Sequence, residues 1–118
     1  MPYLGKISGV GGSRRITAPL LDVLEVLVEA FRQDEEPHGW TIMKAVKRSG
    51  PTVYGVLERL EEWGWATGTW EDLAEDESRP RRRHYRLTPD GRVEAAALLA
   101  QRRPGRSAFG KPLAGGAG

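Results

Sequence analysis

The sequence has no cysteine among its 118 residues, and no apolar run in it approaches the length of a membrane-spanning helix. Without cysteine the chain forms no disulfide framework, no thiolate zinc site and no cysteine nucleophile, which is typical of proteins in a reducing cytoplasm. Residues 1–15 also lack the apolar centre of a signal peptide. We therefore expect a cytoplasmic protein with no membrane segment, and the short length predicts a single folded domain.

The motifs that mark enzymes and metal sites are missing as well. The sequence contains no glycine-rich phosphate loop, no nucleophile motif and no pair of acids on an apolar segment. The two histidines, His38 and His84, are far apart and have no further histidine or cysteine at metal-ligand spacing. We therefore expect a protein that is not an enzyme and that needs no cofactor or metal.

The charges are segregated along the chain, although their formal sum is only +2. Six acidic residues lie between positions 22 and 36, whereas five arginines crowd into residues 79–86. Such a separation allows a protein of small net charge to present a positive face to a polyanion. Arginine, with 14 copies against 4 lysines, also suits phosphate and guanine, because its planar guanidinium donates two parallel hydrogen bonds.

The hydrophobic pattern predicts a long first helix over residues 17–33. Its polar residues form one narrow stripe, and apolar side chains cover most of the remaining circumference. So wide an apolar surface calls for two neighbours, namely the core of the domain and a second subunit. The predicted dimer interface combines this helix with the last helix and comprises Leu20, Leu21, Leu24, Val28, Leu98 and Leu99.

The rest of the chain predicts a small hairpin among further helices. Glycine and proline dominate residues 1–15 and 103–118, which we expect to be a flexible arm and a flexible tail. The order predicts a mainly α fold with a small β-hairpin (α+β), namely a winged helix-turn-helix domain over residues 16–102. The expected elements are helices over 40–48 and 51–63, strands over 65–71 and 82–87, and a last helix that starts at Thr88 and ends before Pro104.

Two stretches resemble the PadR family of bacterial transcriptional regulators. They are HGWTIMKAVKRSGPTVYGVLERLEEWGWATGTWE, which starts at His38, and RPRRRHYRLTPDGR, which starts at Arg79. The resemblance implies that residues 38–40 open the second helix, that residues 51–54 begin the recognition helix and that residues 79–83 belong to the wing. Members of this family are typically homodimeric repressors of dyad-symmetric operators, and their last helix commonly takes part in dimerisation.

The resemblance implies sequence-specific binding of double-stranded DNA by a dimeric repressor, with any small-molecule effector unknown. The alternative is a winged helix that serves as a protein-interaction or RNA-binding module without operator recognition, because a fold does not determine a function. The predicted recognition elements are helix 51–63 and the arginine-rich wing. The expected DNA contacts are Lys47, Arg48, Ser49, Thr52, Tyr54, Arg59, Arg79, Arg81, Arg82 and Arg83.

These signals also have purely structural interpretations. The arginines of residues 79–86 could pair with acidic residues 75–77 on a solvated hairpin, and Tyr54 could cover the edge of the core. The four tryptophans are expected to pack in the core rather than to line a ligand pocket.

Overall fold

The computed structural model describes residues 15–73 and 78–105. The segments expected to be a flexible arm and tail, 1–15 and 103–118, lie almost wholly outside the described residues, and the acidic hairpin tip at 75–77 lies fully outside them. In the described ranges no helix has the length and apolarity needed to cross a membrane.

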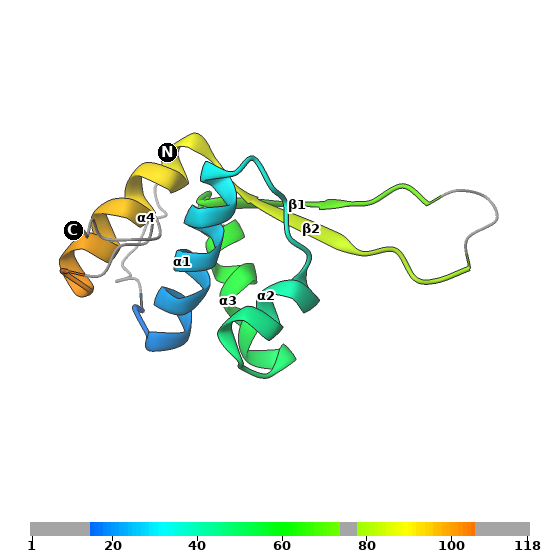
Figure 1. Cartoon of the computed structure of the whole chain (residues 1–118), viewed down its shortest axis with the longest axis horizontal. Coiled ribbons are helices and arrows are strands. Elements are labelled where there is room, and N and C mark those ends of the chain that lie inside the picture. Colours follow the sequence, from blue (N-terminus) through cyan, green and yellow to red (C-terminus); the bar gives the residue numbers. More distant parts are fainter. Residues whose placement is uncertain (1–14, 74–77, 106–118) are drawn as a thin grey trace.

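Four helices and a two-stranded antiparallel hairpin occur in the predicted order within the described part of the chain. The hairpin extends to one side of the helices, and α4 lies on the other side of α1 (Figure 1). This arrangement confirms the mainly α, winged-helix fold. The elements are α1 (Ala18–Arg32), α2 (Gly39–Val46), α3 (Gly50–Glu62), β1 (Ala66–Trp70), β2 (Arg83–Leu87) and α4 (Pro89–Arg102).

Helices α1, α3 and α4 share the same N-terminal capping pattern. The hydroxyl groups of Thr17, Ser49 and Thr88 accept hydrogen bonds from the backbone N–H three residues later, at 3.2, 3.4 and 2.8 Å. A proline occupies the first turn of each of these helices, where its missing N–H leaves no intrahelical bond unmade. The sequence alone therefore determines where these helices start.

Helix α1 lies at the centre of the hydrophobic core and packs against α2, α3, α4 and β2. Within one chain, these neighbours already cover the wide apolar surface of α1, on which the expected dimer interface was placed. Leu98 is half-buried at the edge of the core. The other members of the expected interface have almost no surface left for a second copy, namely Leu20, Leu24 and Val28 at 0% exposure, Leu21 at 8% and Leu99 at 4%.

One carboxylate on α1, Asp22, joins three parts of the fold. It accepts hydrogen bonds from Arg48, just after α2, at 2.8 Å and from Arg103, at the end of α4, at 2.9 Å. Burial opposes the ionisation of Asp22, but the hydrogen bonds from the two arginines outweigh it and lower the pKa of this carboxyl. Arg48, an expected DNA contact, is therefore held against α1, and Arg103, in the expected tail, is held there too.

The start of α4 lies directly against the backbone that leads into β1. The Thr88 hydroxyl donates to the Gly64 carbonyl at 2.8 Å, and the Thr88 N–H donates to the Trp65 carbonyl at 2.9 Å. A Cβ atom on Gly91 would overlap the carbonyl oxygen of Trp65. Position 91 therefore needs glycine because backbone, rather than a movable side chain, fills the space.

Replacing Gly91 by alanine is expected to lower the free energy of unfolding by roughly 1–3 kcal/mol, because the added methyl group forces the backbone to shift. Gly55→Ala is the matched control, since an added Cβ there meets no atom within 4 Å. That control removes a helix-interior glycine and is expected to raise the free energy of unfolding by about 0.5–1 kcal/mol. Urea denaturation followed by circular dichroism measures both, and equal stability of the two variants would contradict the close approach at Gly91.

Candidate nucleic-acid interface

The first turns of α3 present small, hydrogen-bonding groups to solvent. Ser49, Pro51 and Thr52 are exposed, and the Ser49 hydroxyl donates to Thr52 Oγ1 at 3.0 Å. The N–H groups at a helix start favour phosphate, so this end of α3 suits the backbone of a nucleic acid. The opposite side of α3 is held in the core by Val53, Val56, Leu57 and Leu60.

Two further expected contacts flank this surface. Lys47 is exposed at the end of α2 in the left-handed conformation, with φ of 59°. Arg59 is half-buried in the last turn of α3. Lys47 therefore lies just before the start of α3, whereas Arg59 lies near its other end.

An ion pair between Arg83 and Glu61, with N–O distance 2.8 Å, joins the hairpin to α3. The Arg83 guanidinium also lies over the rings of Trp70 and Tyr85, 5.4 and 5.9 Å from their centroids. Gly68 pairs with Tyr85 across the hairpin, and a Cβ on it would overlap both Arg83 and Glu61. The hydrogen bond to Glu61 raises the pKa of Arg83 despite partial burial. This guanidinium therefore positions the hairpin.

A second carboxylate, Glu71, organises the wing just beyond β1. Its backbone N–H donates to the Arg82 carbonyl at 2.9 Å, and its Oε1 accepts from the Arg82 N–H at 3.0 Å. The same carboxylate accepts a hydrogen bond from Arg79 and lies 3.3 Å from Nε2 of His84. The hydrogen bond from Arg79, aided by those from His84 and the Arg82 backbone, lowers the pKa of Glu71 to about 2 despite its desolvation.

The arginines of the wing fall into two classes. Arg79 and Arg83 pair with carboxylates of the hairpin base and α3. Arg81 and Arg82 are exposed, and across residues 15–73 and 78–105 no ion pair involves the guanidinium of either. A guanidinium without an internal carboxylate is available to an external anion. Arg81 and Arg82 are therefore the wing residues best placed to hold phosphate.

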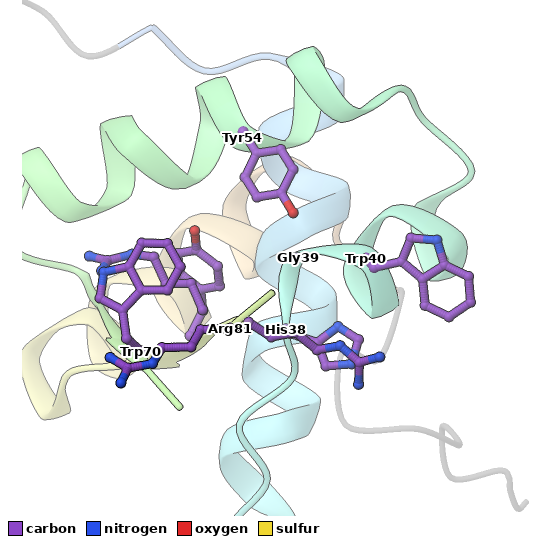
Figure 2. A pocket seen from close by; sticks show the side chains of 9 residues that line it. His38, Gly39, Trp40, Tyr54, Trp70 and Arg81 are labelled. Atoms are coloured by element: carbon purple, nitrogen blue, oxygen red, sulfur yellow. The ribbon is translucent and has the colours of Figure 1, made fainter. Parts of the chain in front are cut away.

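A groove of about 410 Å³ connects these two arginines with α2 and α3. Tyr54 points from α3 toward Gly39, with Trp40 and Trp70 on opposite sides of it (Figure 2). Sequence reasoning placed all four tryptophans in the core. Trp63 and Trp65 do pack there, but Trp40 and Trp70 are 58% and 57% exposed and line the groove, and Tyr54 is 45% exposed.

His38, which precedes α2, also lines the groove. Burial is the main cause that lowers its pKa, and the nearby positive charge of Arg82 adds to the effect. The structure thus brings His38 and Tyr54, which are distant in sequence, to the free arginines of the wing.

An exposed helix start beside a hairpin that exposes Arg81 and Arg82, on a winged-helix scaffold, is the arrangement of a DNA-binding transcriptional regulator. The chain belongs to the transcriptional regulator PadR-like family, whose family model matches residues 23–97. No curated protein sequence matches the chain.

Solved structures of DNA-binding proteins share the fold. A protein described as DNA-binding from Ralstonia eutropha JMP134 is 26% identical, with a TM-score of 0.57 over 72% of this chain and 99% of that one. MepR of Staphylococcus aureus in its DNA-binding conformation is 25% identical, with a TM-score of 0.59 over 72% of this chain and 57% of MepR. The MepR–DNA complex is 28% identical, with a TM-score of 0.55 over 73% and 57%. The family and these structural neighbours are transcription regulators, and the chain spans little more than half of MepR.

The hydrogen bonds of Glu71 make the stability of the wing depend on pH. Its pKa is about 2 in the folded chain against an ordinary 4.5, so its contribution to stability is complete above about pH 4.5 and is lost as the pH falls toward 2. Glu71→Gln is expected to lower the melting temperature at neutral pH, and the difference from the wild type should shrink between about pH 5 and pH 2.

Thermal unfolding followed by circular dichroism across this pH range measures the difference. Asp72→Asn, at the exposed neighbouring position, is the matched control and should change the melting temperature little. A constant difference between the wild type and Glu71→Gln would contradict the assigned role of Glu71.

Proposed function

We propose that the chain represses transcription as a homodimer that binds a dyad-symmetric operator, with α3 in the major groove of each half-site. The observation that carries this proposal is that Arg81 and Arg82 line the same groove as Tyr54 of α3, so helix and wing face one side. The likeness to the MepR–DNA complex supports DNA as the partner. Half-sites about 10 base pairs apart follow from the geometry of helix-turn-helix dimers.

In this proposal the expected contacts have different roles. Lys47, Ser49 and Thr52 hold the DNA backbone at the start of α3, where Tyr54 adds a further contact, and Arg59 reaches bases or phosphates near its end. The free guanidinium groups of the wing neutralise flanking phosphates. Arg48, Arg79 and Arg83 act mainly by positioning these elements, because each is already paired with a carboxylate.

The outer face of α4 supplies the dimer surface in this proposal. Val93, Ala97 and Ala100 follow one another at spacings of four and three residues on α4, and all three are exposed. Val93 is 57% exposed, and the half-buried Leu98 lies on the same helix. A stripe of small apolar residues allows a second helix to approach closely, so α4 can replace the buried leucines of α1 in the role expected from the sequence.

Val93→Glu is expected to convert a dimer into a monomer without unfolding it, because the side chain is exposed and contributes little to the core. Size-exclusion chromatography with light scattering at micromolar concentration measures the mass, and circular dichroism checks the fold. Thr67→Glu, at an exposed position of β1, is the control and should remain dimeric. A wild-type protein that is monomeric throughout would exclude this dimer.

Replacing both Arg81 and Arg82 by alanine is expected to weaken binding to all DNA sequences and to reduce the slope of log affinity against log salt by about two. Arg102→Ala, which removes an exposed arginine at the end of α4, is the control. Fluorescence anisotropy at several salt concentrations measures both quantities.

Unchanged affinity and slope in the double variant would exclude wing contacts to phosphate. Footprinting that shows a lone asymmetric site would exclude the dyad-symmetric operator. If the wild type bound no duplex at all, the chain would instead be a winged-helix module for RNA or protein.

A further inference from the structure

The groove between α2, α3 and the hairpin is lined by two aromatic side chains that are not among the proposed DNA contacts. Trp40 and Trp70 line it and each leaves more than half of its surface to solvent. Neither belongs to the hydrophobic core cluster or to the residues packed against it. Large apolar rings gathered at a concave surface are typical of a binding site rather than of a solvated face.

Neighbouring side chains hold both indole rings. Lys44 Nζ lies 4.4 Å from the centroid of a Trp40 ring, and the imidazole of His38 stacks on Trp40 with centroids 6.4 Å apart and an interplanar angle of 24°. Arg83, itself bound to α3, lies over Trp70. A ring that is already held loses little conformational freedom when a ligand binds, so these walls are preorganised.

The depth of the groove depends on a glycine. Gly39 is buried, and a Cβ atom on it would overlap the hydroxyl and ring of Tyr54. Tyr54 therefore rests against bare backbone at the start of α2, and it lies between Trp40 and Trp70 in Figure 2. With any other residue at position 39, the side chain of Tyr54 would be displaced from this position.

The charge of the groove is positive. No acidic residue belongs to the described lining of the groove, whereas Arg81, Arg82 and Arg83 do. Among the described residues, two carboxylates close to the groove are already paired, Glu61 with Arg83 and Glu71 with Arg79. Flat aromatic walls, together with Arg81 and Arg82, which pair with no carboxylate in ranges 15–73 and 78–105, favour a ligand that combines a planar ring with an anion.

We propose that this groove binds a nucleotide, with the base stacked on Trp40 or Trp70 and the phosphate held by Arg81 or Arg82, which both line the groove. Stacking on an aromatic side chain accepts any base, and guanidinium groups bind phosphate through paired hydrogen bonds. The volume of about 410 Å³ lies in the range of small-molecule sites. A free mononucleotide and an unpaired nucleotide of a DNA strand share this chemistry.

One consequence rests on the function proposed above. Because Arg81 and Arg82 are also the proposed phosphate contacts of the wing, a bound mononucleotide competes with operator DNA. Binding of the nucleotide itself is measurable without DNA, so failure of the operator proposal and failure of the nucleotide site are distinguishable.

The test is a titration of the full chain with AMP, followed by ¹⁵N NMR of the indole N–H groups and assigned with single tryptophan-to-phenylalanine variants. The N–H signals of Trp40 and Trp70 are expected to shift saturably, while those of Trp63 and Trp65 stay in place. The Arg81→Ala, Arg82→Ala double variant should bind AMP at least about tenfold more weakly. Arg102→Ala is the control for loss of positive charge and should bind as the wild type does.

Adenosine and inorganic phosphate are the matched probes, because adenosine has the base without the phosphate and inorganic phosphate has no base. Both should bind at least about tenfold more weakly than AMP. Equal binding of either probe, or undiminished binding of AMP by the double variant, overturns the proposal. A short oligodeoxyadenylate distinguishes the sources: if it shifts Trp40 and Trp70 where AMP does not, the site takes nucleotides of a strand. If neither compound shifts these signals, the groove is not a nucleotide site.

Discussion

The contact between Arg83 and Glu61 determines where the hairpin lies relative to α3, and the rest of the site depends on that position. The two side chains are 30% and 27% exposed, so water screens the pair and it adds at most about 1 kcal/mol to stability. Its importance is geometric, because Gly68 makes room for the pair and the rings of Trp70 and Tyr85 lie under the guanidinium. With the hairpin held in this way, the free arginines of the wing line one groove with Tyr54.

Carboxylates rather than the density of positive charge decide which arginines remain available. Glu71 forms an ion pair with Arg79, and Glu61 forms one with Arg83. Asp22 pairs with Arg48 between α2 and α3. Arg79 and Arg83, which are paired, hold the backbone segment that carries Arg81 and Arg82. Some basic residues of the wing therefore stabilise its position, and others are available for binding. Residues with these two roles lie only one or two positions apart in the sequence.

Local patterns were sufficient for most of the fold. The capping hydroxyls, the first-turn prolines and the helical periodicity involve residues three or four positions apart, so each short segment carries its own information. The alternation of β2 is likewise a local pattern, and it buries Tyr85 and Leu87. The width of the apolar surface on α1 was also recognised. The elements that cover that surface within the chain could not be named, because a pattern shows how much is apolar and not which neighbour covers it.

The sequence by itself determined the helices, the hairpin and the winged-helix order, since these follow from propensities and contacts between near neighbours. Only the tertiary structure decided which polar and aromatic residues face solvent. Arg48 is 26 residues from Asp22 and Arg83 is 22 residues from Glu61, and no local pattern reveals such pairings. Trp40 and Trp70 look like core residues by composition. They line an open groove because their side chains lie outside the core that α1 organises.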